Sequence, residues 1–224
     1  MHSSVEKIKL VQNKINEIIN KKQLKTSPKI IVVTKTWAID KINPLLKFGH
    51  KHFGENKLQE AESKWLNIKN SHEDIQLHMI GKLQSNKAKK AVKLFDYIHS
   101  LDNAKLAQKI FQYQKELNKK VNLFIQVNIG DESQKSGIAL NNLDNFFKYC
   151  TKELSLNIIG LMCLPPVLSN SENHFVKLKS FANHLTLKEL SMGMSSDFEN
   201  AVVNGSTYLR LGSAIFGERK KLFN

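Results

Sequence analysis

A lysine follows the first strongly apolar segment of the sequence, in the stretch Ile30 to Trp37, IIVVTKTW. Four branched aliphatic residues precede Thr34 and Lys35, a pattern typical of a strand that is buried on both faces. A lysine amine in an apolar setting has a lowered pKa, and its neutral form can attack an aldehyde and form a Schiff base. Position at a strand end alone favours a simpler interpretation, in which Lys35 extends its amine into solvent.

Two segments late in the sequence have the features of a phosphate site. Ser196 and Glu199 have the S-x-x-E spacing of a capping box, which would place Ser195 and Ser196 at the start of a helix, where free amides and the helix dipole favour an anion. Gly212 and Ser213 follow the last expected strand, and glycine lets a ligand approach the backbone closely. Either motif alone is more simply an ordinary cap or turn. Together they follow neighbouring strands, where barrels frequently bind phosphate.

A phosphate site facing a lysine at the mouth of a barrel indicates a ligand that carries both a phosphate and an aldehyde. Pyridoxal 5'-phosphate has both groups, and proteins hold it as a lysine Schiff base, or aldimine. The residue types and their positions at strand ends are therefore consistent with this cofactor and with Lys35 as the residue that holds it, while solvent extension of Lys35 stays the simpler interpretation of its position alone.

Short apolar segments alternate with amphipathic ones along the chain, which predicts parallel strands joined by right-handed helical crossovers. The expected strands are 30–33, 52–54, 75–80, 97–99, 121–128, 157–162, 189–192 and 208–209. The expected helices are 5–19, 39–48, 57–69, 85–92, 103–118, 141–151, 172–185 and 197–204. Asn56 with Gln59, and Asp102, are expected to cap two of these helices. Eight such units predict an α/β fold, a single-domain (β/α)8 TIM barrel over residues 1–224, with a helical extension at about residues 3–24. A doubly wound open sheet is the alternative.

Composition narrows the class of protein. A chain of 224 residues suits one α/β barrel. The sequence has no run of 18 apolar residues, so we expect no membrane span. The charged N-terminus lacks the features of a signal peptide, so we expect a cytoplasmic protein in which Cys150 and Cys163 are buried free thiols. The net charge of +14 admits an acidic partner such as nucleic acid. Arginine occurs only at Arg210 and Arg219, so specific nucleic-acid recognition is the less favoured reading.

Eight segments between about residue 29 and residue 219 carry a more specific pattern: VVTKTW, HFGENKLQEAESKW, LHMIGKLQSNK, IHSLDNAKLA, QVNIGDESQKSGI, GLMCLPP, LSMGMSSDFENAV and GSTYLRLGSAIFGER. In this order the sequence resembles the pyridoxal phosphate homeostasis proteins. These are single-domain barrels similar to the N-terminal domain of bacterial alanine racemase. The segment LSMGMSSDFENAV followed by RLGSAIFGER is highly specific.

The resemblance assigns residues to the cofactor. It implies that Lys35 forms the Schiff base and that the phosphate lies against Ser195, Gly212 and Ser213. Ser213 stands where the family often has threonine, and either hydroxyl can donate a hydrogen bond. Asn56 falls in the G-E-N motif near the cofactor.

The resemblance also implies that Arg210 faces the pyridine nitrogen. A guanidinium keeps its proton, so it would leave that nitrogen unprotonated and weaken carbanion chemistry. Alanine racemases add a C-terminal domain whose tyrosine acts as a second base, and none is expected here because the sequence ends at Asn224. His78 is a candidate second base, although a packed histidine is the simpler interpretation. Lys135 matches a racemase arginine near the ring, and its role stays open because lysine makes no bidentate contact.

We therefore expect a monomeric, non-enzymatic protein of pyridoxal phosphate homeostasis. It would hold the cofactor as a lysine aldimine, without a metal, and release or transfer it to apo forms of pyridoxal-phosphate-dependent enzymes. A low-activity amino-acid racemase is the alternative, and a basic nucleic-acid-associated protein is the third hypothesis.

Overall fold

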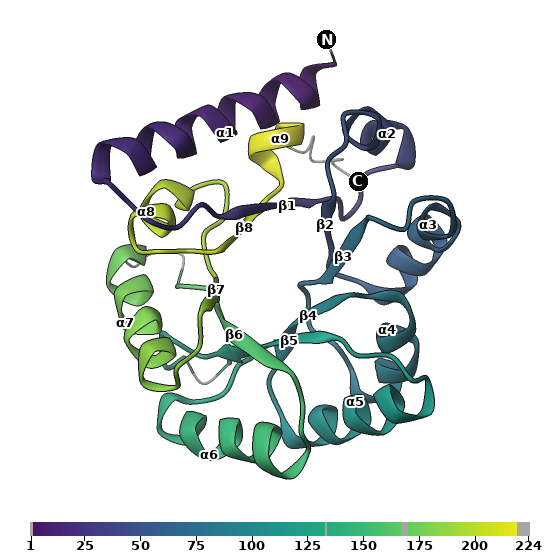
Figure 1. The fold of residues 1–224 in the computed structure, drawn as a ribbon, viewed down its shortest axis with the longest axis vertical. Helices are drawn as coiled ribbons and strands as arrows, with labels where there is room; N and C mark the ends of the chain where they lie inside the picture. Colours follow the sequence, from purple (N-terminus) through teal and green to yellow (C-terminus); the bar gives the residue numbers. More distant parts are fainter. Residues whose placement is uncertain (1, 133, 167–169, 219–224) are drawn as a thin grey trace.

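Strands and helices alternate along the chain and close into a ring. The computed structural model describes residues 2–132, 134–166 and 170–218. Figure 1 shows the barrel end-on. The parallel strands β1 to β8 follow one another around the ring in chain order, and β1 pairs with β8. The predicted (β/α)8 barrel is confirmed, and the alternative of an open sheet is wrong. One domain over residues 1–224 stays a prediction, and Arg219 lies outside the described residues.

Each predicted strand is present, with ends that differ by one or two residues. The strands are β1 Lys29–Val33, β2 His52–Glu55, β3 Gln76–Met79, β4 Tyr97–Leu101, β5 Asn122–Val127, β6 Ile158–Cys163, β7 Glu189–Ser191 and β8 Tyr208–Leu211. Because β8 extends beyond its predicted end to Leu211, Arg210 lies within the strand, near its carboxyl end.

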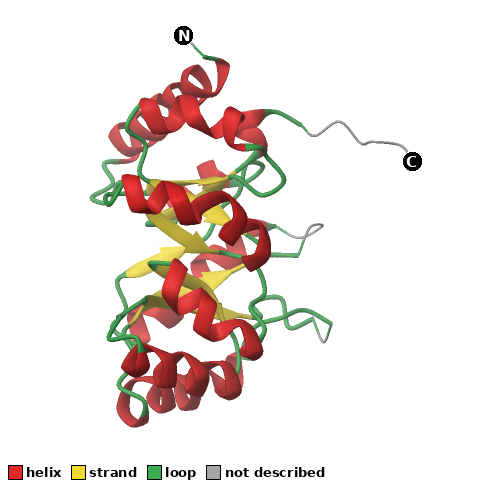
Figure 2. Cartoon of the chain, turned by 90° about the vertical axis from the view of Figure 1, so that its right-hand side faces the viewer, coloured by secondary structure: helices red, strands yellow, loops and turns green. Residues whose placement is uncertain are grey.

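Helices surround the ring, and Figure 2 shows them on both sides of the strands. They are α1 Ser3–Lys22, α2 Ile39–Lys47, α3 Leu58–Ser71, η1 Ser85–Lys87, α4 Ala88–Leu94, α5 Ala104–Glu116, η2 Leu140–Asn142, α6 Leu143–Lys148, η3 Tyr149–Glu153, α7 Ser171–His184, α8 Phe198–Val203 and α9 Ser213–Phe216. The helix predicted at 141–151 is divided into a 3-10 turn (η2), α6 and a π-helical end (η3).

The predicted N-terminal helix, α1, packs on the outside of the ring against α9, α8 and α2 (Figure 1). Its buried face carries Val5, Ile8, Val11 and Ile15, at the three- and four-residue spacing of an amphipathic helix. The helix after β8, α9, has only four residues. α1 therefore covers the part of the barrel wall that α9 is too short to cover.

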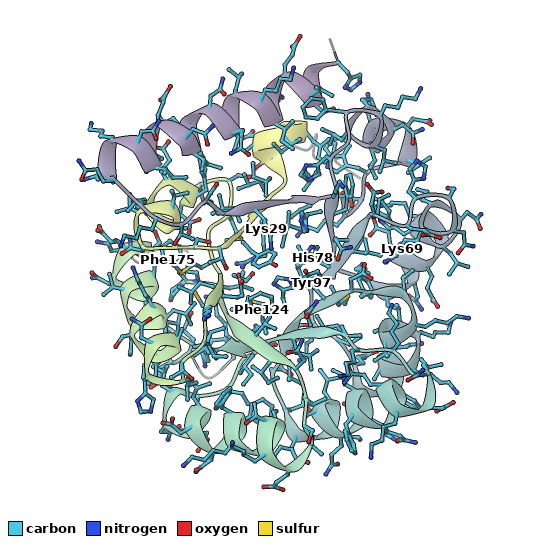
Figure 3. The ribbon with its side chains drawn as sticks, in the orientation of Figure 1. Lys29, Lys69, His78, Tyr97, Phe124 and Phe175 are labelled. Atoms are coloured by element: carbon cyan, nitrogen blue, oxygen red, sulfur yellow. The ribbon has the colours of Figure 1, made fainter. Side chains whose placement is uncertain are left out.

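Alternation along the strands separates two cores. Ile30 and Val32 of β1 belong to the large core between strands and helices, whereas Ile31 belongs to a smaller core inside the ring with Phe124 and Tyr208. Figure 3 shows His78, Tyr97 and Phe124 together near the middle of the ring. The interior of this barrel is therefore partly polar.

Both cysteines, Cys150 and Cys163, are free and buried, as predicted. Burial raises the pKa of each thiol to about 12, so both stay protonated at neutral pH. Within the ranges that the structure describes, no helix is both long and apolar enough to cross a membrane.

Two predicted helix caps are wrong. α3 begins one residue later than expected, with Lys57 at its N-cap and no side-chain cap, so Asn56 is not the capping residue. At α5 the cap is Asn103, whose side chain accepts a hydrogen bond from the amide of Leu106 at 2.9 Å, while Asp102 accepts one from Asn103 itself. In both cases the neighbouring residue takes the N-cap position, since capping patterns do not fix the exact start of a helix.

Candidate functional site

A cavity of about 630 Å³ opens among the loops that follow the carboxyl ends of the strands. Its volume lies in the range of about 300–1,000 Å³ that is usual for small-molecule sites. It is lined by Val33, Lys35, Trp37, Asn56, Ile80, Lys135, Leu164, Pro165, Met194, Ser195, Ser196, Arg210, Gly212, Ser213 and Gly217. All six residues predicted to bind a cofactor lie on this one cavity. Six strands contribute a lining residue at or just beyond their ends, and the loop after β5 contributes Lys135.

Lys35 enters the cavity from a strained turn at the end of β1. Thr36, which follows it, has φ of 65°, a left-handed conformation that is rare for a β-branched residue. The amide of Thr36 donates to the carboxylate of Glu60, and the amide of Trp37 donates to the carbonyl of Thr34 at 3.1 Å. Backbone strain of this kind persists where surrounding contacts determine it, and it is concentrated at functional sites.

A buried ion-pair cluster holds the residue just before Lys35. Oε1 of Glu55 accepts hydrogen bonds from Thr34 Oγ1 at 2.6 Å, Lys64 Nζ at 2.8 Å and Trp65 Nε1 at 2.9 Å. Lys64 also donates to the carbonyl of Thr34 at 2.8 Å. The side chain of Glu55 is 0% exposed and that of Lys64 is 8% exposed. This Glu55 cluster (Thr34, Glu55, Lys64 and Trp65) therefore ties the end of β1 to β2 and α3.

Ser195 connects the loop after β7 to the loop after β8. Its Oγ accepts hydrogen bonds from the amide of Gly212 at 3.3 Å and from the amide of Ala214 at 3.1 Å. The predicted capping box is wrong, because α8 begins at Phe198 with Asp197 at its N-cap and no side-chain cap. Ser195 thus lies at the start of α9 instead of α8, on the same two loops that the sequence selected.

Gly212 and Ser213 lie where an anion could approach the backbone. A Cβ on Gly212 would meet Val33 at 3.5 Å, an ordinary contact, and its φ of −115° suits any residue. The protein itself would therefore accept a side chain at this position. The missing side chain is explained if a ligand occupies the space next to the backbone.

Arg210 is 4% exposed and is held from two sides. Nη1 donates to Ser191 Oγ at 2.7 Å and Nη2 donates to the carbonyl of Cys163 at 2.8 Å. Burial lowers the pKa of the guanidinium, and the neighbouring Cys163 and Asp197 partly oppose this. Arginine nevertheless keeps its proton in proteins. Two of its five N–H groups serve these contacts, which leaves donors for a ligand.

Asn56 lies on the cavity because its backbone is packed against Gly81. A Cβ on Gly81 would lie 2.3 Å from the carbonyl oxygen of Asn56, so only glycine fits beside this loop. The side chain that was predicted to cap α3 is instead on the cavity wall.

The two residues whose roles the sequence left open have different positions. Lys135 lines the cavity from the loop after β5 and pairs with Glu132 at 2.6 Å. His78 does not line it, because its ring is fully buried inside the barrel and bonds to His52 and His99. The interpretation of His78 as a packed histidine therefore fits the geometry better than a second base.

Sequence reasoning missed most of the apolar wall. This wall includes Trp37, Ile80, Leu164, Pro165 and Met194. Trp37 and Pro165 lie shortly after the ends of β1 and β6, within the segments IIVVTKTW and GLMCLPP. Their position after a strand end was the signal available in the sequence. The ring of Trp37 also packs against Phe216 of α9, with centroids 5.1 Å apart.

Comparisons with known proteins cover nearly the whole barrel. The family model of the alanine racemase N-terminal domain matches residues 11–220. The pyridoxal phosphate homeostasis protein of Aquifex aeolicus is 37% identical over 201 residues, covering 86% of this chain and 87% of that protein. The protein of the same name from a Synechocystis species is 38% identical over 205 residues, covering 88% and 94%. The structure of PipY from Synechococcus elongatus, with PLP bound, is 33% identical, has a TM-score of 0.78, and is matched over 91% of this chain and 100% of that one.

Proposed function

The chain belongs to the pyridoxal phosphate homeostasis proteins, within the family of the alanine racemase N-terminal domain, and on that premise we propose that it binds pyridoxal phosphate (PLP) in the cavity described above. When bound, this cofactor supplies an aldehyde that a lysine amine can attack, together with a phosphate and a pyridine ring. The proposed role is to hold PLP safely and release it, within PLP homeostasis.

One observation carries the proposal. Three kinds of group converge on one cavity. A lysine comes from the end of β1 and an arginine comes from β8. The loops after β7 and β8 supply backbone that a ligand could approach. These groups fit the three parts of the cofactor. Lys35 would hold the aldehyde carbon, and Arg210 would donate to the ring nitrogen. Ser195, Gly212 and Ser213 would bind the phosphate, and Asn56 would lie beside the ring.

The cavity favours binding over turnover. Racemisation needs a proton donor or acceptor on each face of the substrate. Among the described residues that line the cavity, Lys35 and Lys135 are the groups that could exchange a proton, and no histidine, tyrosine or carboxylate is present. Lys135 is engaged with Glu132. Arg210 would also keep the ring nitrogen unprotonated, which weakens the cofactor as an electron sink.

Absorbance and mass spectrometry test this proposal. Protein mixed with PLP and reduced with borohydride should carry the cofactor mass on the peptide that contains Lys35. Lys35→Ala should lose this mass. The matched control is Lys57→Ala, because Lys57 is an exposed lysine close to the site that does not line the cavity. A colourless protein without added mass at Lys35 would overturn the proposal, and sustained racemisation of alanine would favour the racemase.

The proposal extends to the fate of the bound cofactor. The protein would act in the cytoplasm as a monomer and would pass PLP to apo-enzymes. Two features support an encounter with a partner protein. The net charge of +14 favours an acidic partner, and the exposed apolar residues Leu164 and Met194 at the rim offer a contact surface. Loaded protein should reactivate an apo-aminotransferase faster than PLP dissociates into buffer. Equal rates would argue against direct transfer, and light scattering reports the oligomeric state.

A further inference from the structure

Three histidine rings form a line through the interior of the barrel, below the cavity. His52 Nδ1 lies 3.0 Å from His78 Nε2, and His78 Nδ1 lies 2.9 Å from His99 Nε2. His99 Nδ1 lies 2.8 Å from Ser191 Oγ. Ser191 Oγ in turn accepts a hydrogen bond from Arg210 at 2.7 Å. We call Ser191, His99, His78 and His52 the histidine relay. It runs from Arg210 on the cavity to the first residue of β2, at the opposite end of the barrel.

The order of protons along the relay follows from Arg210. A guanidinium only donates, so Ser191 Oγ must accept from it. The serine hydroxyl is then satisfied when it donates to Nδ1 of His99. His99 consequently carries its proton on Nε2 and donates to Nδ1 of His78, and His78 donates in turn from Nε2 to His52. The reverse order would leave the Ser191 proton without an acceptor among the described residues.

Aromatic side chains clamp the two inner rings of the relay. His78 stacks on Tyr97 with centroids 4.3 Å apart, and His99 stacks on Phe124 with centroids 4.2 Å apart. Figure 3 shows His78 beside Tyr97, with Phe124 nearby. Burial lowers the pKa of both histidines well below the usual value, and the positive charge of Arg210 lowers the pKa of His99 further. Both rings are therefore neutral, as the proton order requires.

We propose that Ser191, His99 and His78 are positioning residues that fix the Arg210 guanidinium against the ring of the bound cofactor. This inference rests on the proposed function for its ligand, but the relay itself is a property of the protein alone. Without the acceptor at His99, the hydroxyl of Ser191 is free to turn, and its hydrogen bond with Arg210 is no longer held in one arrangement. The relay therefore determines the position of a residue that none of its histidines contacts.

Nuclear magnetic resonance of the unloaded protein tests the relay without any cofactor. Nitrogen-15 spectra of the histidine rings should place the protons of His52, His78 and His99 on Nε2. They should also show hindered rotation of the Arg210 guanidinium, which Ser191→Ala should release. A proton on Nδ1 of His99, or a guanidinium that rotates equally in both proteins, would overturn the proposal.

Loaded protein supplies the second test. Ser191→Ala and His99→Leu should each raise the PLP dissociation rate about tenfold, the effect of losing one hydrogen bond to a charged group. Both should also shift the pH midpoint of the cofactor absorbance. His99→Asn, whose side-chain oxygen can accept from Ser191, should restore much of the wild-type behaviour. Tyr97→Phe is the matched control, because it keeps the ring stacked on His78 and removes only a hydroxyl directed to Tyr208.

The outcomes separate the inference from the proposed function. If the wild type takes up no PLP, the proposed function fails, and the spectra of the unloaded protein still decide the relay. If the wild type binds PLP but Ser191→Ala matches it in dissociation rate and pH midpoint, the proposed function stands and the relay does not position Arg210. Ser191→Ala removes a single oxygen, so it decides the question even if His99→Leu fails to fold.

Discussion

Two buried polar clusters support the residues proposed to hold the cofactor, and they do so with different chemistry. The Glu55 cluster, between the ring and α3, secures the strand end before Lys35 with a carboxylate and an ammonium 2.8 Å apart. The histidine relay, inside the ring, secures Arg210 with neutral groups. Lys64 comes from α3, whereas the buried residues of the inner core, Ile31, Phe124, Met162 and Tyr208, all come from strands. The difference suggests that a charged pair is used where a helix can supply the counter-charge.

The largest effect on stability is expected at Glu55. Glu55→Ala removes the buried carboxylate that accepts from Thr34, Lys64 and Trp65. Glu60 still pairs with Lys64 at 3.0 Å, so we expect a loss at the lower end of the range for a broken buried pair, about 3 kcal/mol. Urea unfolding measures the loss. The control is Asp74→Ala, which removes an exposed partner of Lys51 and should change stability by about 0.5 kcal/mol or less. A small loss at Glu55 would mean that charge does not distinguish the two clusters.

A smaller effect is expected in the neutral cluster. His99→Leu leaves the Ser191 hydroxyl and one nitrogen of His78 without partners, which costs about 1–3 kcal/mol. The same urea experiment should therefore rank His99→Leu below Glu55→Ala. The reverse order would show that the stacking of His99 on Phe124 contributes more than its hydrogen bonds.

The histidine relay should make the stability of the protein sensitive to acid. Burial lowers the pKa of His78 and His99 in the folded protein, whereas in the unfolded chain each titrates near 6.5. The unfolded state therefore binds more protons below pH 6.5. Stability should be fully present above that pH and fall as the pH drops below it, by up to about 1.4 kcal/mol per pH unit for each histidine. Unfolding between pH 7 and 5 measures the slope, which should decrease in His99→Asn and stay unchanged in Asp74→Ala.

The smallest effect on stability is expected at Gly212, which belongs to neither cluster. Gly212→Ala places a methyl group 3.5 Å from Val33 in a permitted backbone conformation, so the unfolding free energy should change by about 0.5 kcal/mol or less. Equilibrium dialysis should nevertheless detect weaker PLP binding. Unchanged affinity would mean that the phosphate does not lie against this backbone.

The sequence predicted the barrel well because each short apolar run is separated from the next by an amphipathic one. It also selected Lys35 and the loops of Ser195 and Gly212 from their positions after strands. Asn56 and Arg210 came from family resemblance alone, and the roles of all the predicted site residues stay predictions. The predicted caps failed because a capping pattern does not fix the exact start of a helix. The contact of Ser195 with the loop after β8 joins distant parts of the chain, which local patterns do not encode.

The histidine relay could not be predicted from sequence. His52, His78 and His99 are separated by more than twenty residues, and each is unremarkable in its own segment. They become neighbours because β2, β3 and β4 are adjacent in the ring. The contact between His99 and Ser191 then crosses the barrel interior over 92 residues of sequence.

The relay has a consequence for how variants of this barrel are interpreted. The amino-terminal face of such barrels is usually associated with stability and the carboxyl-terminal face with chemistry. Here His52, on the amino-terminal side, is joined through hydrogen bonds to Arg210 on the cavity. If the relay positions Arg210 as proposed, a change at His52 is expected to alter ligand release without touching the ligand. Ranking variants by their distance from the cavity would treat such a change as one that affects only stability.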